Sequence, residues 1–262
     1  QVLCVVSTRR AASEIFDLLC MNGSDERIFH LSALMIPAHR SAVISQIKDR
    51  LKDGLPCMVV STQLIEAGVD IDFPIVYREL AGIDSIKQSA GRCNREGHCE
   101  KGHVYVFDCP DTRVTKYWLG RMRELGRETI LQMSDPFDDQ GVKYFFKARY
   151  QVQDTDSYEI MRNFANPEKV NGENLPFETC GREFRLVDND GTNVFVPWGE
   201  EGRELLKVIR EDTTDIETLR KIQRYSVNVA LWQAQDLYRR SAIAREGSLD
   251  LWVLEPHDGI LD

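Results

Sequence analysis

The sequence contains no long hydrophobic run. Of its 262 residues, 42% are hydrophobic and 29% are charged, and no apolar stretch approaches the ~20 residues that a membrane-spanning helix needs. The first residues read as a strand and do not resemble a signal peptide. We therefore expect a globular protein that contacts no membrane and is long enough for one large domain or two ordinary ones.

The cysteines show no paired spacing. Their number, seven, is odd, which is typical of reduced thiols and predicts a cytoplasmic protein. Cysteines and histidines do gather at Cys93, His98, Cys99, His103 and Cys109. Structural zinc sites use short ligand pairs such as Cys-x-x-Cys. This group has no such pair, so we expect no metal site.

The sequence also lacks an excess of positive charge. Its net charge of −9 excludes a broad basic face, because nonspecific binding to nucleic acid depends on many Lys and Arg side chains. Any contact with nucleic acid must therefore use a local groove of hydroxyls, amides and a few arginines.

A loop that binds nucleotide phosphates is absent. The sequence has no Gly-Lys dipeptide, hence no Gly-x-x-x-x-Gly-Lys-Ser/Thr loop, and it has no Asp-Glu-x-His. The chain begins without Met and directly in a strand. We expect it to be a piece of a longer protein and to hydrolyse no ATP by itself.

Strand and helix patterns alternate over the first part of the chain. We predict strands at 2–6, 28–33, 57–61, 75–78 and 103–107, and helices at 11–20, 38–51 and 85–94. Strands interleaved with helices predict an α/β fold, a parallel sheet with helices on both faces. We assign residues 1–110 to this lobe.

The pattern changes after residue 110. We predict helices at 114–133, 142–148, 201–210 and 215–222, and strands at 225–231 and 249–254. The turn sequence Asp-Asn-Asp-Gly at 188–191 predicts a hairpin between strands at 183–187 and 193–197. We assign 111–165 to a helical linker and 166–262 to a smaller α+β accessory domain.

Hydroxyl side chains follow three of the predicted strands. Ser7 and Thr8 follow the first, Ser32 falls at the end of the second, and Thr62 follows the third. The carboxyl ends of parallel strands share one edge of a sheet, where ligands bind in such folds. The agreement among the strands is more informative than any single hydroxyl.

Two arginines stand three residues apart at Arg92 and Arg95, behind Gln88 and Gly91. On a helix this spacing places both guanidinium groups on one face, where they can reach one phosphate. A glycine within a helix costs about 1 kcal/mol relative to alanine, which suggests a close approach. The alternative is a solvated helix face whose arginines form ordinary salt bridges.

A short loop precedes the arginines, at Gly68, Asp70 and Asp72. Gly68 permits a tight turn after one helical turn, and Asp70 can then accept a hydrogen bond from a ribose hydroxyl. Thr62 and nearby amides can hold a nucleic-acid phosphate. The alternative is that both aspartates are turn and cap residues, and this is the better interpretation when they are taken alone.

Taken together, these segments resemble a known order. The chain is similar to the second RecA-like lobe of superfamily 2 helicases and translocases in three successive segments: Ser-Thr, Glu-Ala-Gly-Val-Asp-Ile-Asp and Gln-x-x-Gly-Arg-x-x-Arg. Residues 61–72 look like motif V of that family and residues 88–95 like motif VI. Ser7 and Thr8 fit motif IV, and Ser32 fits the next DNA-contacting segment. The resemblance covers about residues 1–108.

A narrower resemblance is to the helicase–nuclease of type I CRISPR systems. It rests on Ile-Pro-Ala-His-Arg at 36–40, Tyr-Arg-Glu-Leu-Ala-Gly-Ile-Asp at 77–84 and Gly-Arg-Cys-Asn-Arg-Glu-Gly at 91–97. Three later segments are similar to its linker and accessory domain: Leu-Pro-Phe-Glu at 175–178, Phe-Arg-Leu-Val at 184–187 and Gln-Arg-Tyr-Ser-Val at 223–227. The resemblance after residue 110 is looser.

This family implies an ATP- and Mg²⁺-dependent 3′-to-5′ motor on single-stranded DNA, recruited to a target bound by Cascade, the CRISPR surveillance complex. Cutting falls to an HD nuclease domain. His257-Asp258 lacks the further His and Asp that such a domain needs, so we expect the nuclease and the first RecA-like lobe upstream.

The resemblance also implies roles for residues. Arg92 and Arg95 would contact nucleotide phosphates, with Gln88 orienting water or a phosphate, while Gly68 and Asp70 line the nucleotide side. The DNA backbone would be held by Ser7, Thr8, Ser32 and Thr62.

Two rivals stay open. One is another superfamily 2 translocase, for instance an RNA helicase. The other is a non-catalytic docking module that recruits a partner or is the target of an inhibitor protein.

Several aromatic residues could stack on bases, but their helical spacing favours core packing. They are Trp118, Tyr144, Phe145, Phe146 and Tyr150. We also expect Tyr225 and Trp232 in the core.

Overall fold

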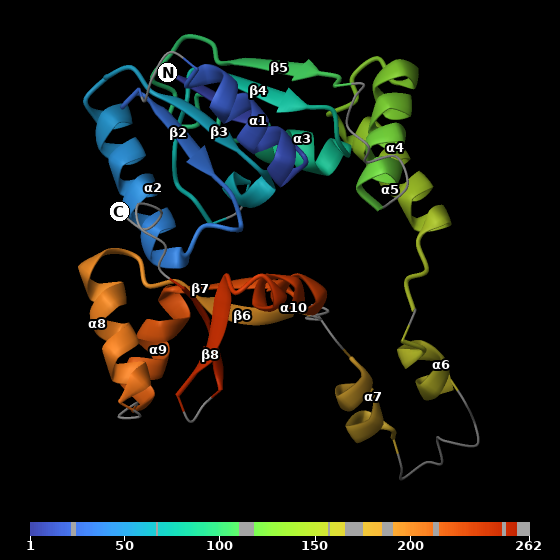
Figure 1. The fold of residues 1–262 in the computed structure, drawn as a ribbon. Coiled ribbons are helices and arrows are strands. Elements are labelled where there is room, and N and C mark those ends of the chain that lie inside the picture. Colours follow the sequence, from blue (N-terminus) through green and yellow to red (C-terminus); the bar gives the residue numbers. More distant parts are fainter. Residues whose placement is uncertain are drawn as a thin grey trace.

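The protein contains two β-sheets with helices around them (Figure 1). The structure is a computed structural model. It describes residues 1–21, 25–66, 68–109, 118–156, 158–165, 175–184, 191–211, 215–247 and 250–255. Within these residues no helix has the length and apolar character needed to cross a membrane.

The first sheet is parallel throughout. Its strands are β1 (Val2–Val5), β2 (Ile28–Leu31), β3 (Met58–Ser61), β4 (Ile75–Glu79) and β5 (His103–Phe107). Their order is β2-β3-β1-β4-β5, so β1 lies at the centre, paired with β3 on one side and β4 on the other. The predicted α/β class and its five strands are confirmed.

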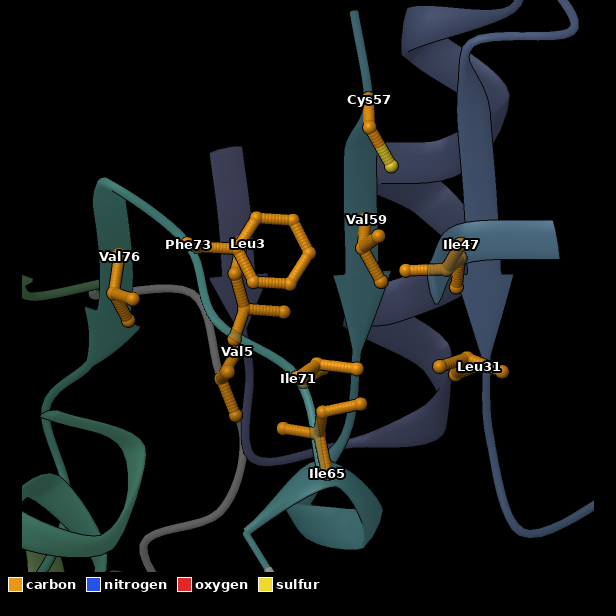
Figure 2. Close-up of a cluster of buried hydrophobic side chains, with 10 residues drawn as sticks. All are labelled: Leu3, Val5, Leu31, Ile47, Cys57, Val59, Ile65, Ile71, Phe73 and Val76. Atoms are coloured by element: carbon orange, nitrogen blue, oxygen red, sulfur yellow. The ribbon is translucent and has the colours of Figure 1, made fainter. Parts of the chain in front are cut away.

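Helices cover both faces of this sheet. Side chains alternate between the two faces along a strand, and β1 shows the alternation directly. Leu3 belongs to the same buried cluster as Val59 and as Ile47 of α2 (Pro37–Lys52) on one face, as Figure 2 shows. Cys4 packs with Ala12 of α1 (Arg9–Leu19) on the other. Each face of β1 therefore has its own hydrophobic core.

The third helix is shorter than predicted. α3 spans Ile83–Ala90, with Gly91 at its C-cap, whereas we expected a helix over 85–94. A β-bridge between Phe73 and Cys93 causes the early end, because Phe73 donates to the carbonyl of Arg92 at 2.9 Å and accepts from Asn94 at 2.9 Å. The expectation that the arginines share a helix face is wrong.

Two further helices lie beyond the carboxyl ends of β4 and β5 (Figure 1): α4 (Trp118–Gln132) and α5 (Asp139–Val152). They share a core with Leu80, Ile83 and Ile86, centred on the fully buried Phe145. A Cβ at Gly126 of α4 would lie 2.0 Å from the carbonyl oxygen of Ala81, so only glycine allows this close approach.

Replacing Gly126 by alanine should loosen α4 from the sheet. Overpacking typically costs 1–3 kcal/mol, and the atom that the new methyl group would meet belongs to backbone that cannot rotate away. We expect a lower urea midpoint and a loss of about 1–3 kcal/mol of unfolding free energy. Gly181→Ala is the matched control, because a methyl group at that position would meet no atom within 4 Å. Equal effects of both variants would contradict the packing argument.

The second sheet is mixed. It contains β6 (Gly191–Phe195), β7 (Ser226–Ala230), β8 (Ile243–Glu246) and β9 (Leu251–Leu254) in the order β7-β6-β9-β8. α8 (Gly199–Arg210), α9 (Ile216–Arg224) and α10 (Leu231–Arg239) accompany it. An α/β lobe followed by a smaller mixed α and β part is confirmed.

Several details of this second part differ from prediction. Glu183 ends helix α7 (Phe177–Glu183) instead of opening a strand, and residues 185–190 lie outside the described residues. Among the described residues, β6 pairs with β7 and β9, so its hairpin partner is not the segment we predicted. α6 (Ile160–Ala165), α10 and β8 were not predicted at all.

The two sheets are joined through the start of α2. Ile36 is buried in a cluster with Phe195 and other side chains of the second sheet's core, and the His39 ring stacks on Trp198 at 4.6 Å between centroids. Figure 1 shows the second sheet beside this end of α2. The accessory part is thus anchored to the segment that follows Ser32.

The aromatic residues differ in burial, and Tyr144 and Phe146 are half-buried. Phe145 and Tyr225 are buried as predicted. Trp118, Tyr150 and Trp232 are exposed, so the expectation of core packing is wrong for these three. Of the three, Trp118 lies at the carboxyl edge of the first sheet, where it lines a pocket.

Candidate nucleotide and nucleic-acid site

The strand-end hydroxyls meet at one edge of the first sheet. They follow β2, β3 and β1, which are neighbours in that order, and backbone hydrogen bonds join their ends. The amide of Thr62 donates to Leu31 at 3.2 Å and that of Val6 to Ser61 at 2.9 Å. The structure therefore brings Ser7, Thr8, Ser32 and Thr62 to the same edge.

These hydroxyls differ in exposure. Ser32 and Thr62 are only 3% and 5% exposed, and Thr8 caps α1 by accepting from the amide of Ala11 at 3.1 Å. Ser7 is half-buried, and its amide donates to the carboxylate of Glu79 at 2.6 Å. Ser7 and Thr8 are thus both more accessible than Ser32 and Thr62.

A short loop leaves the end of β3. Its one helical turn, η1, spans Gln63–Ile65, and Gly68 then takes a left-handed conformation with φ +74°, which glycine adopts without strain. Asp70 and Asp72 follow. The loop thus has the shape that its sequence predicts, a single turn closed by glycine.

Arg92 holds this loop by its backbone. Its Nε donates to the carbonyl of Ile65 at 3.1 Å and its Nη2 to that of Glu66 at 2.8 Å. The two carbonyls end the short helical turn, where unpaired acceptors attract a cation. Arg92 therefore fixes the end of η1 through these two hydrogen bonds.

Arg95 contacts the aspartates of the same loop. Its backbone amide donates to Asp72 at 2.8 Å, and its guanidinium pairs with Asp70. Both side chains of the pair are well exposed, so water screens their attraction. Gln88 lies exposed on α3, and Gly68 is exposed in the loop.

A buried charge network supports the loop from below. Glu66 is 7% exposed at its side chain, and its carboxylate accepts from Ser85 at 2.8 Å and Ser89 at 3.0 Å. Arg78 of β4, whose side chain is 0% exposed, lies 3.2 Å from the same carboxylate and donates to the carbonyl of Glu79 at 2.8 Å.

Burial dominates the electrostatics of this network. Desolvation raises the pKa of Glu66, and the charge of Arg78 and the two serine hydroxyls offset only part of that rise. Desolvation also lowers the pKa of Arg78, opposed by Glu66 and Glu79. Each charge therefore depends on the other to remain ionised inside the protein.

Sequence reasoning missed this network. Two signals were present: the charged pair Arg78-Glu79 interrupts an apolar strand, and Ser85 and Ser89 are four residues apart on one helix face. Charged residues are rarely fully buried unless paired. A strand with adjacent opposite charges therefore predicts a buried ion pair.

The residues present fit part of a nucleotide site. Arg92 and Arg95 bring two guanidinium groups to one loop that also carries Asp70. Guanidinium groups suit phosphate oxygens. Within the described part of the chain, no group of three His, Cys, Asp or Glu side chains could hold a metal ion. ATP would find phosphate partners here, while a Mg²⁺ ion would need ligands from elsewhere.

This arrangement resembles that of a known class of protein. Hydroxyls at the carboxyl edge of a parallel sheet, followed in the chain by an acidic loop and two arginines that contact it, resemble the arrangement in the second RecA-like lobe of superfamily 2 helicases. Comparison with known proteins then narrows the class. Residues 1–98 match the family described as CRISPR-associated nuclease/helicase Cas3, C-terminal, so this part of the chain is similar to the C-terminal region of a Cas3 helicase.

Two curated relatives support this family. The CRISPR-associated nuclease/helicase Cas3 of Haloferax volcanii is 43% identical over 92 residues, 34% of this chain and 10% of the relative. That of Methanothermobacter thermautotrophicus is 23% identical over 275 residues, 92% of this chain and 33% of the relative. The chain thus spans a third or less of the length of these relatives.

Solved structures share the fold over nearly the whole chain. A crystal structure of T. fusca Cas3 has a TM-score of 0.62 at 15% identity and covers 97% of this chain and 35% of its own. A structure of a CRISPR RNA-guided surveillance complex, pre-nicking, contains a similar chain with a TM-score of 0.55 at 17% identity. The match covers 97% of the present chain and 37% of the chain in that complex. The resemblance stated from sequence is confirmed, and it extends to the accessory part.

Proposed function

We propose that this chain is the second motor lobe and accessory domain of an ATP-dependent single-stranded DNA translocase that is coupled to DNA degradation in type I CRISPR interference. The observation that carries the proposal is the attachment of the arginine segment to the acidic loop. Arg92 holds the carbonyls of Ile65 and Glu66, and Arg95 pairs with Asp70. Movement of either segment must therefore move the other.

The proposed roles follow from this attachment. ATP, when bound, supplies the phosphoryl chemistry that drives movement. Arg92 and Arg95 act on its phosphates, where positive charge stabilises the transition state, with Gln88 orienting water or a phosphate. Gly68 and Asp70 line the nucleotide side of the loop.

The DNA side is the strand-end edge of the same sheet. Ser7, Thr8, Ser32 and Thr62 hold the backbone, since hydroxyls and amides contact phosphates without reading sequence. Burial of Ser32 and Thr62 means that their contacts require a small opening of this edge, since the Thr62 amide already donates to the carbonyl of Leu31.

The domains that this chain does not contain are proposed from its similarity to the family. The first RecA-like lobe would supply the loop that cradles ATP and the Mg²⁺ ligands, and an HD domain would cut DNA, so we propose that this chain alone is inactive. A Cas3-like chain in a surveillance complex supports Cascade as partner. The domain boundaries at 110 and 165, the cytoplasmic location and an inhibitor protein as partner stay predictions.

A comparison of nucleic-acid strands tests the proposal against its nearest rival. In the complete protein, ATP hydrolysis should rise on addition of single-stranded DNA and change little with RNA of the same sequence. Phosphate release measured with each strand gives the answer. Greater stimulation by RNA would favour the RNA-helicase alternative. Binding of a partner with no hydrolysis on either strand would favour the docking module.

A further inference from the structure

A second site lies at the same edge, beside Trp118. It is a pocket of about 310 Å³, lined by the ends of three strands and by α4 and α5. Ser7 follows β1, Gln63 follows β3, and Gly82 follows β4, so the pocket opens where the strand-end hydroxyls lie. Its volume is at the lower limit for small-molecule sites, which suits one planar group.

Trp118 is held in place at this pocket. It is 39% exposed, and the guanidinium of Arg149 lies 5.2 Å from the ring centroid. Arg149 is fixed in turn by Asp84 at 2.8 Å and by Phe146 at 5.7 Å. A tryptophan that is supported by a cation and still exposed is preorganised to stack on another ring.

The charge of the pocket favours a neutral ligand. Asp84 neutralises Arg149, and the other lining arginine, Arg78, pairs with Glu66, so the pocket offers no unpaired cation for a phosphate among the described residues that line it. Its walls instead combine Trp118, Leu119 and Met122 with the polar side chains of Ser7 and Gln63. Apolar walls with a few hydrogen-bonding groups suit a heteroaromatic ring, such as a nucleobase.

We propose that this pocket takes an unstacked base of the single DNA strand whose backbone follows the strand-end hydroxyls. The proposal rests on the proposed function for the strand, while the pocket itself rests on Trp118 and its supports. Ser7 belongs to both the hydroxyl set and the pocket wall, so a backbone held at Ser7 places a base within reach of Trp118.

Variants of Trp118 test the base site on the 262-residue chain. The probe is a short deoxythymidine oligonucleotide, and its abasic counterpart keeps the phosphates without bases. Base stacking on an aromatic residue predicts that Trp118→Ala weakens binding of the oligonucleotide by about 5- to 150-fold and leaves binding of the abasic strand unchanged. Trp118→Phe should retain most of the affinity.

Trp232→Ala is the matched control, because Trp232 is also exposed and does not line this pocket; it should bind like the parent. Thermal melting confirms that each variant folds. If the alanine variant does not fold, Trp118→Phe provides the test: the oligonucleotide should quench tryptophan fluorescence of the parent, and this quenching should be lost in Trp118→Phe. Equal binding of both strands, unaffected by Trp118→Ala, overturns the base site but leaves the proposed backbone contacts intact. No binding of either strand overturns both, and quenching by free thymidine nucleotide alone overturns the assignment to a strand.

Discussion

Replacing Arg95 by alanine in the complete protein is expected to reduce ATP hydrolysis by at least about a thousandfold and to abolish unwinding, since an arginine that acts on transferring phosphates contributes roughly 10³–10⁵ in rate. The Arg95 side chain is exposed and pairs with the exposed Asp70. Its loss should therefore cost little folding stability, which lets the effect on catalysis be measured directly.

Binding of single-stranded DNA should change by less than about threefold in the same variant, because the strand-end hydroxyls are untouched. Arg27→Ala is the control: Arg27 is also exposed and pairs with an aspartate, Asp25, and its side-chain hydrogen bonds are to that residue, not to the acidic loop. Phosphate release and fluorescence anisotropy measure the two activities. Unaltered ATP hydrolysis by the Arg95 variant would refute the assignment of this arginine.

Arg92 should behave differently from Arg95. Its guanidinium is hydrogen-bonded to two backbone carbonyls, so it is part of the loop's structure as well as a candidate for phosphate contact. Replacing Arg95 should therefore affect catalysis alone, whereas replacing Arg92 should affect both catalysis and the order of the loop. This division could not be read from the Arg-x-x-Arg spacing.

The strand and helix order of the first lobe could be predicted because its hydrophobic periods are regular. The placement of the hydroxyls followed from topology, since parallel strands end at one edge. The end of α3 could not be predicted, because it is decided by a bridge between Phe73 and Cys93, which are distant in the sequence. Local spacing contains no information on such a contact.

The second part was harder to predict because its strands are short and its pairing is nonlocal. β6 pairs in parallel with β9, far along the chain, while the turn sequence at 188–191 suggested a local hairpin. The exposed Trp232 illustrates the same limit: helical spacing indicates a face but does not say whether another element covers it. Tertiary contacts override the local pattern in both cases.

The buried network makes the other large prediction. Replacing Arg78 by methionine removes the buried cation that pairs with Glu66 and also interacts electrostatically with the buried Glu79. Breaking a buried pair by removing one partner typically costs about 3–5 kcal/mol, because the remaining charge is left uncompensated. We expect a loss of that size in the free energy of unfolding near neutral pH, measured by urea denaturation. Arg127→Met, at a partly exposed pair with Asp108, should cost far less.

The pH dependence identifies the cause of this loss. Burial already raises the pKa of Glu66 above its ordinary value of 4.5, and Arg78 partly offsets that rise, so the variant should raise it further. A carboxyl whose pKa is higher in the folded state binds more protons there, and its folded state gains stability as pH falls through that pKa. The deficit should therefore shrink between about pH 7 and about pH 5.

A second substitution separates charge from packing. Adding Glu66→Gln to Arg78→Met removes one of the two uncompensated charges while keeping a side chain that can accept from Ser85 and Ser89. The double variant should recover a large part of the stability lost near neutral pH and show a weaker pH dependence than Arg78→Met alone. If the loss of unfolding free energy is the same at both pH values and in both variants, the role of Arg78 is packing. The loop that Arg92 contacts would then be supported by side-chain packing and not by the buried ion pair.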